Sequence, residues 1–130
     1  GEAYVQGIEA DIDWRVTRRL SLLGFLASTY GQQVTADVPM RRIPPLNGLA
    51  GARYRWANGV WLEGTLRAAG AQTRLAPGWA VANIVAGARV GGRLLLSGGL
   101  ANVFNEAYRV HGSGVDGPGR NAWLSLRVEF

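Results

Sequence analysis

Three carboxylates at alternate positions form the densest group of side chains able to do chemistry: Glu9, Asp11 and Asp13. Residues i, i+2 and i+4 of a β-strand lie on one face, so the three could bind a cation together. The same row is also typical of a solvated strand face, which arginines such as Arg53 and Arg55 on nearby strands would neutralise. We expect the second arrangement, a solvated wall, and interpret Glu63 and Arg67 in the same way.

Other groups that support catalysis or metal binding are missing from the sequence. There is no Cys, so neither a thiolate metal site nor a disulfide can form, and one His, His111, cannot form a His cluster. The glycine-rich stretch 112–120 lacks the Lys of a phosphate-binding loop and predicts a surface loop. We therefore expect no enzymatic activity and no cofactor. His111 is then either solvated or in contact with a ligand.

The charge balance does not indicate nucleic acid. The net charge is +5 and all fourteen basic residues are Arg, but they are spread along the chain. No RNA-binding signature, helix-turn-helix pattern or zinc-finger spacing accompanies them. Hydrophobic residues make up 48% of the 130, which argues against disorder. Because the chain begins with Gly, we expect an excised segment or a processed product of a longer protein.

Alternation with period two predicts β-strands throughout. Seven strands are expected, over residues 7–14, 20–30, 47–56, 60–69, 80–90, 94–104 and 121–130. Short connections (15–18, 57–59, 91–92) alternate with long ones (31–45, 70–78, 109–120). Antiparallel hairpins then place all short turns at one end and all long loops at the other, which is the layout of outer-membrane barrels.

The charges predict two different faces. If even-numbered residues share one face, the following charged residues fall on the other: Glu9, Asp11, Asp13, Arg53, Arg55, Glu63, Arg67, Arg89, Arg127 and Glu129. Leu23 and Phe25 depart from the pattern, since they place apolar side chains on the charged face. The even-numbered positions are rich in Ala and Gly, which would underfill the core of a soluble sandwich, whereas lipid chains fill any contour.

Aromatic residues gather near the predicted strand ends. Trp14, Tyr54, Trp56 and Phe130 belong to the short-turn side, and Tyr30, Trp79 and Tyr108 to the other. Two such belts are typical of barrels that cross a bilayer. The last strand alternates Leu124, Leu126 and Val128 and ends on Phe130, as expected of the closing strand of a barrel.

The C-terminal stretch "NVFNEAYRVHGSGVDGPGRNAWLSLRVEF" resembles the end of TonB-dependent outer-membrane receptors. The resembling residues are Asn102, Val103, Phe104, Asn105, Tyr108, Pro118, Gly119, Arg120, Asn121 and Phe130. "GEAYVQGIEADIDWRVTRRLSL" is similar to that family's Gly-(Ile/Val)-Glu strand and periplasmic turn. "RRIPPLNGLAGARY" is similar to its Ile-Pro-Pro segment before a descending strand. The three segments follow the family order and cover essentially the whole chain.

The resemblance implies a fold and a function. The fold is all-β, an antiparallel up-and-down transmembrane β-barrel segment, with residues 1–130 as the C-terminal part and the plug domain and Ton box absent. The function is energy-coupled uptake of a scarce nutrient, most often a ferric siderophore or similar metal chelate, across a Gram-negative outer membrane. A passive porin or small structural barrel, and a soluble β-sandwich binding module, stay open as alternatives.

The resemblance also implies partners. These are outer-membrane lipid and lipopolysaccharide, the TonB energy-transducing complex through the missing N-terminal part, a metal-chelate ligand and the barrel-assembly machinery. Residues Leu124, Leu126, Val128 and Phe130 would form the terminal strand that this machinery recognises.

An iron chelate is usually anionic, so cations of the external loops are the candidates for ligand contact. They are Arg41, Arg42, Arg74, Arg109, His111 and Arg120, and Trp79 and Tyr108 could stack on a flat chelate. The planar fork of Arg donates two hydrogen bonds to carboxylate or catecholate oxygens. These arginines could equally hold anionic lipopolysaccharide or bridge loops. Arg120, next to Asn121, is expected to fix loop structure.

Overall fold

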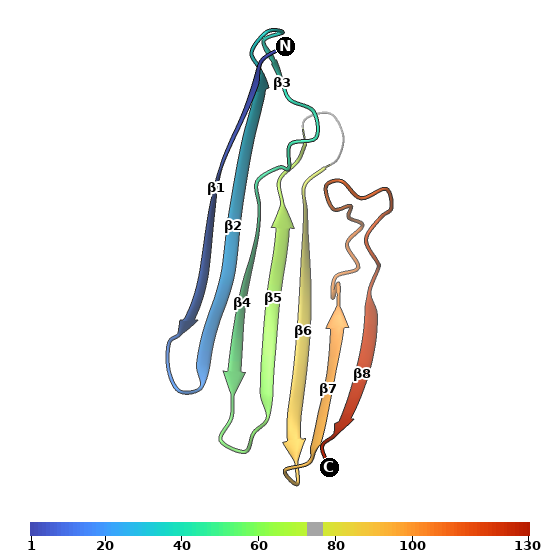
Figure 1. Cartoon of the computed structure of the whole chain (residues 1–130). Helices are drawn as coiled ribbons and strands as arrows, with labels where there is room; N and C mark the ends of the chain where they lie inside the picture. The colour runs from blue at the N-terminus through green and yellow to red at the C-terminus, as the bar shows by residue number, and fades with distance from the viewer. Residues whose placement is uncertain (73–76) are drawn as a thin grey trace.

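The computed structural model describes residues 1–72 and 77–130. Its strands are β1 (Ala3–Arg15), β2 (Leu20–Gln33), β3 (Val38–Pro39), β4 (Asn47–Arg55), β5 (Trp61–Ala69), β6 (Trp79–Val90), β7 (Leu94–Ala101) and β8 (Asn121–Val128). They form one antiparallel sheet in the order β1-β2-β4-β5-β6-β7-β8, and β3 pairs with the end of β2 (Figure 1). This up-and-down meander confirms the predicted fold class and all seven predicted strands. Those described residues contain no helix that could cross a membrane.

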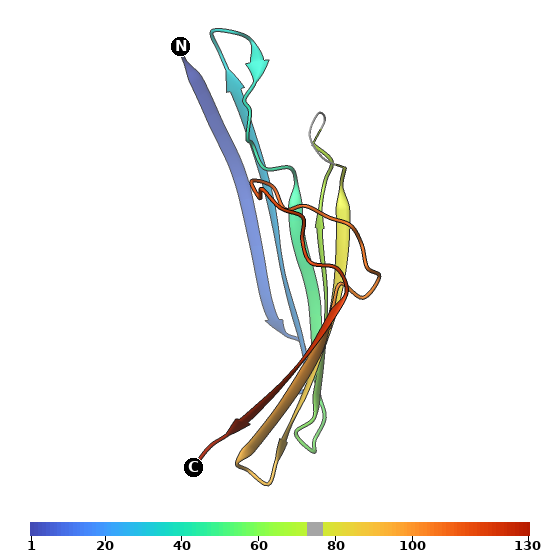
Figure 2. The ribbon, with the colours of Figure 1, turned by 90° about the vertical axis from the view of Figure 1, so that its right-hand side faces the viewer.

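The sheet is a single curved layer with two different ends. Both edge strands, β1 and β8, lie to the same side of the central strands (Figure 2). The N-terminus and the long connections lie at one end, and the short turns and the C-terminus lie at the other (Figure 1). The predicted alternation of short and long connections is therefore confirmed. The two ends are called the long-loop end and the short-turn end.

Local chemistry fixes the short turns. Between β1 and β2, the Thr17 hydroxyl accepts hydrogen bonds from the backbone N–H groups of Arg19 and Leu20, at 3.1 and 2.9 Å. Asn58 accepts one from the Val60 N–H at 3.2 Å in the next turn. Gly91 and its neighbour Gly92 have φ values of 58° and 75°, which glycine adopts without strain, and with Arg93 they form the three-residue connection between the paired residues Val90 and Leu94.

One parity rule holds across the whole sheet. Odd residues pair with odd residues in the registers that join the seven long strands, as in Asp11 with Phe25 and Glu63 with Val85. Side chains alternate along a strand, so even-numbered residues form one face, the even face, and odd-numbered residues form the odd face. None of the even-numbered positions in these strands is charged. The predicted separation of charges is confirmed.

The even face is apolar and open to its surroundings. Ile8 is 73% exposed, Leu66 50% and Leu124 79%, and Val81 is the one buried hydrophobic residue of the described part of the chain. Soluble monomers rarely expose contiguous apolar patches larger than a few hundred Å². A soluble sandwich would cover this face with a second sheet, and the described residues form one sheet. The described residues therefore favour the barrel segment over the β-sandwich alternative.

Several strand limits differ from the prediction. β1 and β2 extend beyond their predicted limits, and β3 pairs with Gln32 and Gln33, so the first long connection begins later than residue 31. The polar residues there show no hydrophobic alternation that would have indicated a strand. β7 ends at Ala101 instead of residue 104, because Asn102 has a φ of 49° and turns the chain.

Candidate functional site

The long-loop end of the odd face brings together several of the predicted ligand-contact residues. The segment 102–120 folds back on β6, where the Val103 N–H donates to the Ala82 carbonyl at 2.9 Å. The ring of Tyr108 lies 4.9 Å from the ring of Trp79, and the guanidinium carbon of Arg67 lies 5.9 Å from the Trp79 ring centroid. Arg67, Trp79 and Tyr108 are named the aromatic stack. The sequence indicated Trp79 and Tyr108 as candidates for ligand contact, but placed Arg67 only on a solvated strand face.

Asn102 is the centre of the hydrogen bonding that holds segment 102–120. Its side chain is 2% exposed, and its own N–H donates to Asn83 Oδ1 at 2.9 Å. Its Oδ1 accepts from the Glu106 N–H at 2.8 Å. Its Nδ2 donates to the carbonyls of Glu106 and Pro118, at 2.8 and 3.1 Å. One side chain thus joins the beginning and the end of the loop.

A second asparagine supports the same closure. Asn105 Oδ1 accepts a hydrogen bond from the Arg120 N–H at 2.8 Å. The Gly117 N–H donates to the Tyr108 carbonyl at 2.7 Å, which closes the loop nearer its tip. The Asn121 Nδ2 donates to the Gly119 carbonyl at 2.9 Å. Motif residues of the C-terminal loop are therefore in contact with one another, and Arg120 takes part through its backbone N–H.

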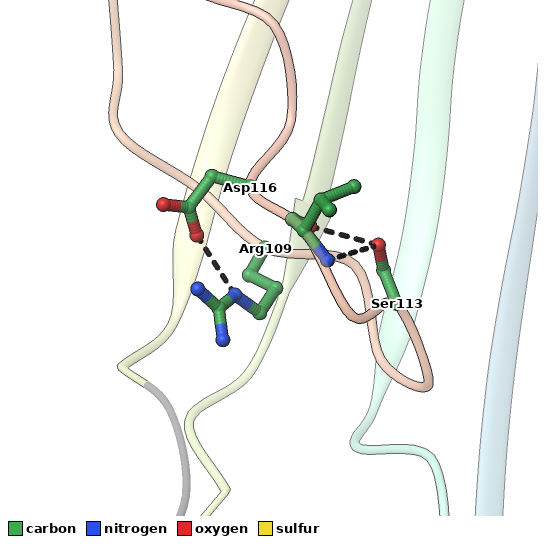
Figure 3. Close-up of polar contacts among 4 residues, drawn as sticks. Arg109, Ser113 and Asp116 are labelled. Carbon is green, nitrogen blue, oxygen red and sulfur yellow. Dashed lines mark hydrogen bonds and ion pairs between the residues drawn. The ribbon is translucent and has the colours of Figure 1, made fainter.

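Arg109 lies at the tip of this loop with its charge compensated. Its Nε donates to Asp116 Oδ1 at 2.8 Å (Figure 3). Beside it, Ser113 and Val115 exchange two hydrogen bonds, of 2.8 and 3.2 Å, through the Ser113 hydroxyl. Both partners of the ion pair are exposed, so the pair orders the loop tip and adds little stability.

His111 joins the loop to a distant segment. Its Nε2 lies 3.1 Å from the Arg42 carbonyl oxygen, and because a carbonyl only accepts, the proton is on Nε2. Arg41 and Arg42 are exposed in the turn that follows β3. The structure brings Arg42 and His111 together through the Arg42 backbone, while Arg74 lies outside the described residues.

The predicted pairing of the acidic row with Arg53 and Arg55 is wrong. Arg53 Nε instead donates to Glu63 Oε2 at 2.7 Å, on the neighbouring strand. β2 separates β1 from β4 and places Leu23, Phe25 and Ala27 opposite the acids. No ion pair of the described residues includes the row, and they contain no cluster of three metal-ligating side chains.

The aromatic belts are confirmed at one end and corrected at the other. Trp14 and Tyr54 lie on the even face near the short turns, where the Tyr54 ring is 4.9 Å from that of Trp56. At the long-loop end the even face instead carries Tyr4 and Tyr30, with ring centroids 6.0 Å apart. Trp79 has odd parity and contacts Tyr108, so neither belongs to the even-face belt.

No family model and no curated protein matches the sequence. Among solved structures, the chain is similar to the copper transporter OprC, with a TM-score of 0.85 and 24% identity. The match covers 98% of this chain and 24% of that protein, so the chain spans about a quarter of the transporter's length. At this identity the likeness shows the fold, a segment of an antiparallel β-barrel wall.

Proposed function

We propose that this chain is the C-terminal part of the barrel of a TonB-dependent outer-membrane receptor, which takes up a metal complex. The observation that supports it most is the match of nearly the whole chain to a quarter of a metal transporter. The motif at Asn102–Asn105 and the Pro-Gly-Arg-Asn motif at 118–121 agree with that family, and the structure brings them into contact.

The dimensions of the even face support a place in a bilayer. Tyr4 and Trp14 lie ten residues apart on β1, one in each aromatic belt. At ~3.3 Å per residue and a tilt of ~40°, ten residues span roughly 25 Å along the membrane normal. This equals the apolar band of about 25 Å in outer-membrane barrels. The apolar face between the belts would contact lipid, and lipopolysaccharide would contact its outer rim.

A passive porin is the second candidate, and the odd face disfavours it. Leu23, Phe25 and Leu49 lie side by side on that face, through the pairs Phe25–Leu49 and Leu23–Gly51. A wide water-filled channel would leave these side chains wetted at a cost of about 25 cal/mol per Å² of apolar surface. A lumen filled by a plug domain covers them.

The cargo proposed here is a metal complex, with an anionic iron chelate as its finer form. Arg67, Trp79 and Tyr108 offer a cation and two rings on the odd face, and Arg41, Arg42, Arg109 and His111 lie around the same end. The matched transporter carries copper. Copper as a bare ion is therefore the alternative cargo.

Uptake in the full receptor tests the proposal. Cells that carry or lack the gene are given radiolabelled Cu²⁺ or a ferric tris-catecholate complex, with and without an uncoupler of the inner-membrane proton gradient. We expect saturable uptake that requires both the gene and the gradient. Uptake that does not saturate and ignores the uncoupler would instead identify a passive pore.

The contribution of the loop cations is tested in the same assay. Changing Arg41, Arg42 or Arg109 to Ala, at matched surface amounts, should weaken binding of the anionic complex roughly ten- to a hundredfold where the contact is buried in the complex. Equal affinity in all three variants would limit these arginines to lipopolysaccharide or loop contacts.

Topology and assembly have their own tests. A cysteine at Ser113, but not at Asn58, should react with an impermeant maleimide on intact cells, because Asn58 belongs to a short turn on the periplasmic side. Removing Phe130 should lower the amount of assembled receptor, since Leu124, Leu126, Val128 and Phe130 would form the strand that the barrel-assembly machinery recognises. Normal outer-membrane amounts of that variant would contradict the role.

A further inference from the structure

Asn102 is unusual in this chain because it is buried. Among the residues that the structure describes it is the one buried polar side chain, in a sheet whose strands are otherwise largely open. A buried amide is costly unless its donors and acceptor find partners. Asn102 uses both ends: Oδ1 accepts from Glu106, and Nδ2 donates to Glu106 and Pro118.

The partners of Asn102 lie at the two ends of one loop. Glu106 begins the excursion and Pro118 ends it, while Asn83, which accepts from the Asn102 N–H, belongs to β6 beneath. The side chain therefore fixes the loop ends to each other, and the backbone N–H fixes them to the sheet. A loop held at its base in this way loses much of its conformational freedom before any ligand binds.

The tip between these ends contains the side chains that would form a ligand site. Tyr108 contacts Trp79, His111 contacts the Arg42 carbonyl, and Arg109 is paired with Asp116. The contacts with Trp79 and Arg42 require the loop tip to lie at one position relative to the sheet. The hydrogen bonds of Asn102 at the base of the loop help to set that position.

We propose that Asn102 is a positioning residue: it latches segment 106–118 against β6, so that this segment is a preformed wall of the ligand site. The inference rests on the proposed function for its ligand, but the latch itself can be tested without one. Preorganisation raises affinity because the loop loses its conformational entropy during folding, and not when the ligand binds. This loop then stays in place when ligand binds.

Asn102 and Asn105 offer a matched pair of variants. Asn102→Asp keeps the Oδ1 acceptor but places a carboxylate oxygen against the carbonyls of Glu106 and Pro118, so two bonds are lost. Asn105→Asp keeps the acceptor that receives the Arg120 N–H, the one side-chain bond that Asn105 makes in the described residues. Both positions have positive φ, 49° and 54°, which Asp tolerates.

The first measurement needs no ligand. In the full receptor on intact cells, external protease should cleave segment 106–118 faster in Asn102→Asp than in the wild type, and Asn105→Asp should match the wild type. Equal protease resistance of Asn102→Asp and the wild type would overturn the latch. Asn102→Gly suits the positive φ and removes the same bonds without a charge, so it replaces the Asp variant if that variant does not assemble. If neither assembles, Asn102 acts in folding and the positioning role is overturned.

The second measurement is uptake of Cu²⁺ or the ferric tris-catecholate complex at matched surface amounts. Asn102→Asp should raise KM roughly tenfold or more and leave Vmax within about twofold, because energy coupling lies elsewhere. A loop that is cleaved faster while KM stays unchanged would overturn the positioning role and leave the proposed function intact. A wild-type receptor that takes up neither probe would contradict the proposed function instead.

Discussion

The two faces of this sheet are built on different rules. On the even face most positions are apolar or small, and the specific contacts of Tyr30, with Tyr4 and Gln32, lie at the long-loop end. On the odd face, specific pairs decide the structure. Trp61 lies over Gly87 and Trp123 lies over Gly99, each opposite its partner on the next strand. The guanidinium of Arg53 lies 4.7 Å from the Trp61 ring centroid.

This difference has a physical cause. In the proposed receptor the even face contacts lipid, which fills any contour, so transfer free energy would be the main constraint on that face. In that receptor the odd face would pack against protein side chains, water and a ligand, each of which requires a particular shape and a particular charge. Substitutions on the even face should therefore change the stability of the folded receptor through the polarity of the new side chain. Those on the odd face should change it through side-chain packing and charge pairing.

A charge in the middle of each face gives the largest expected contrast. Ile84 is on the even face, 44% exposed, and Val85 is on the odd face, opposite Glu63. Ile84→Arg should destabilise the folded receptor by about 2–4 kcal/mol, the cost of a cation at the bilayer midplane. Val85→Arg should be tolerated, because position 85 lies on the face that carries the charged residues of the strands, opposite Glu63.

The measurement is the folded fraction of the full receptor in urea, after extraction from outer membranes. Equal loss in both variants would mean that the even face does not contact lipid, and the comparison of the two faces would fail.

Two strand glycines give the next contrast. A Cβ at Gly87 would lie 2.6 Å from Trp61 Cζ2, whereas a Cβ at Gly64, on the even face, meets nothing within 4 Å. Gly87→Ala should destabilise by about 1–3 kcal/mol through overpacking. Gly64→Ala should be neutral or favourable by about 0.5–1 kcal/mol, because Ala loses less backbone freedom on folding.

Urea unfolding of both variants measures these changes. Repeating Gly87→Ala in a Trp61→Ala background should remove its penalty, since the ring that it meets is gone. A penalty that persists there would place the strain in the backbone instead of the Trp61 contact.

The sequence predicted those features of the fold that depend on side-chain alternation, and missed those that do not. The even face, the strand order and the short turns at Asn58 and Gly91 were evident in the sequence, because they depend on alternation and on local turn chemistry. The ends of β1 and β2 at the long-loop end were missed, since residues 3–6 and 31–33 show no regular alternation of apolar and polar side chains. A pattern indicates a strand only where its two faces meet different surroundings.

The sequence predicted which residues belong to the candidate site better than it predicted the contacts between them. Trp79 and Tyr108 were predicted to stack on a flat chelate, and the structure places their two rings in contact with each other. The contribution of Arg67, the compensation of Arg109 by Asp116 and the pairing of Arg53 with Glu63 depend on register and on loop conformation. These contacts join residues that are far apart in sequence or meet only in a particular loop conformation, so no spacing in the sequence indicated them.

The smallest expected effect lies on the odd face at the chain end. Arg89 Nη1 donates to Glu129 Oε2 and to the Gly92 carbonyl, both at 2.9 Å, so it ties the residue after β8 to the end of β6. The hydrogen bond from Arg89, and then its positive charge, lower the pKa of Glu129. A carboxyl with a lowered folded-state pKa contributes stability at neutral pH, and the contribution is lost as pH falls through that pKa.

Glu129→Gln should therefore lower the unfolding midpoint slightly at pH 7, and the difference should vanish in acid and in high salt, because both partners are exposed. Glu9→Gln is the matched control, an odd-face carboxylate without an ion pair in the described part of the chain, and its midpoint should equal the wild type's. A Glu129→Gln loss that persists in acid would mean that the side chain acts through packing, and that fit rather than charge governs even the exposed rim of this face.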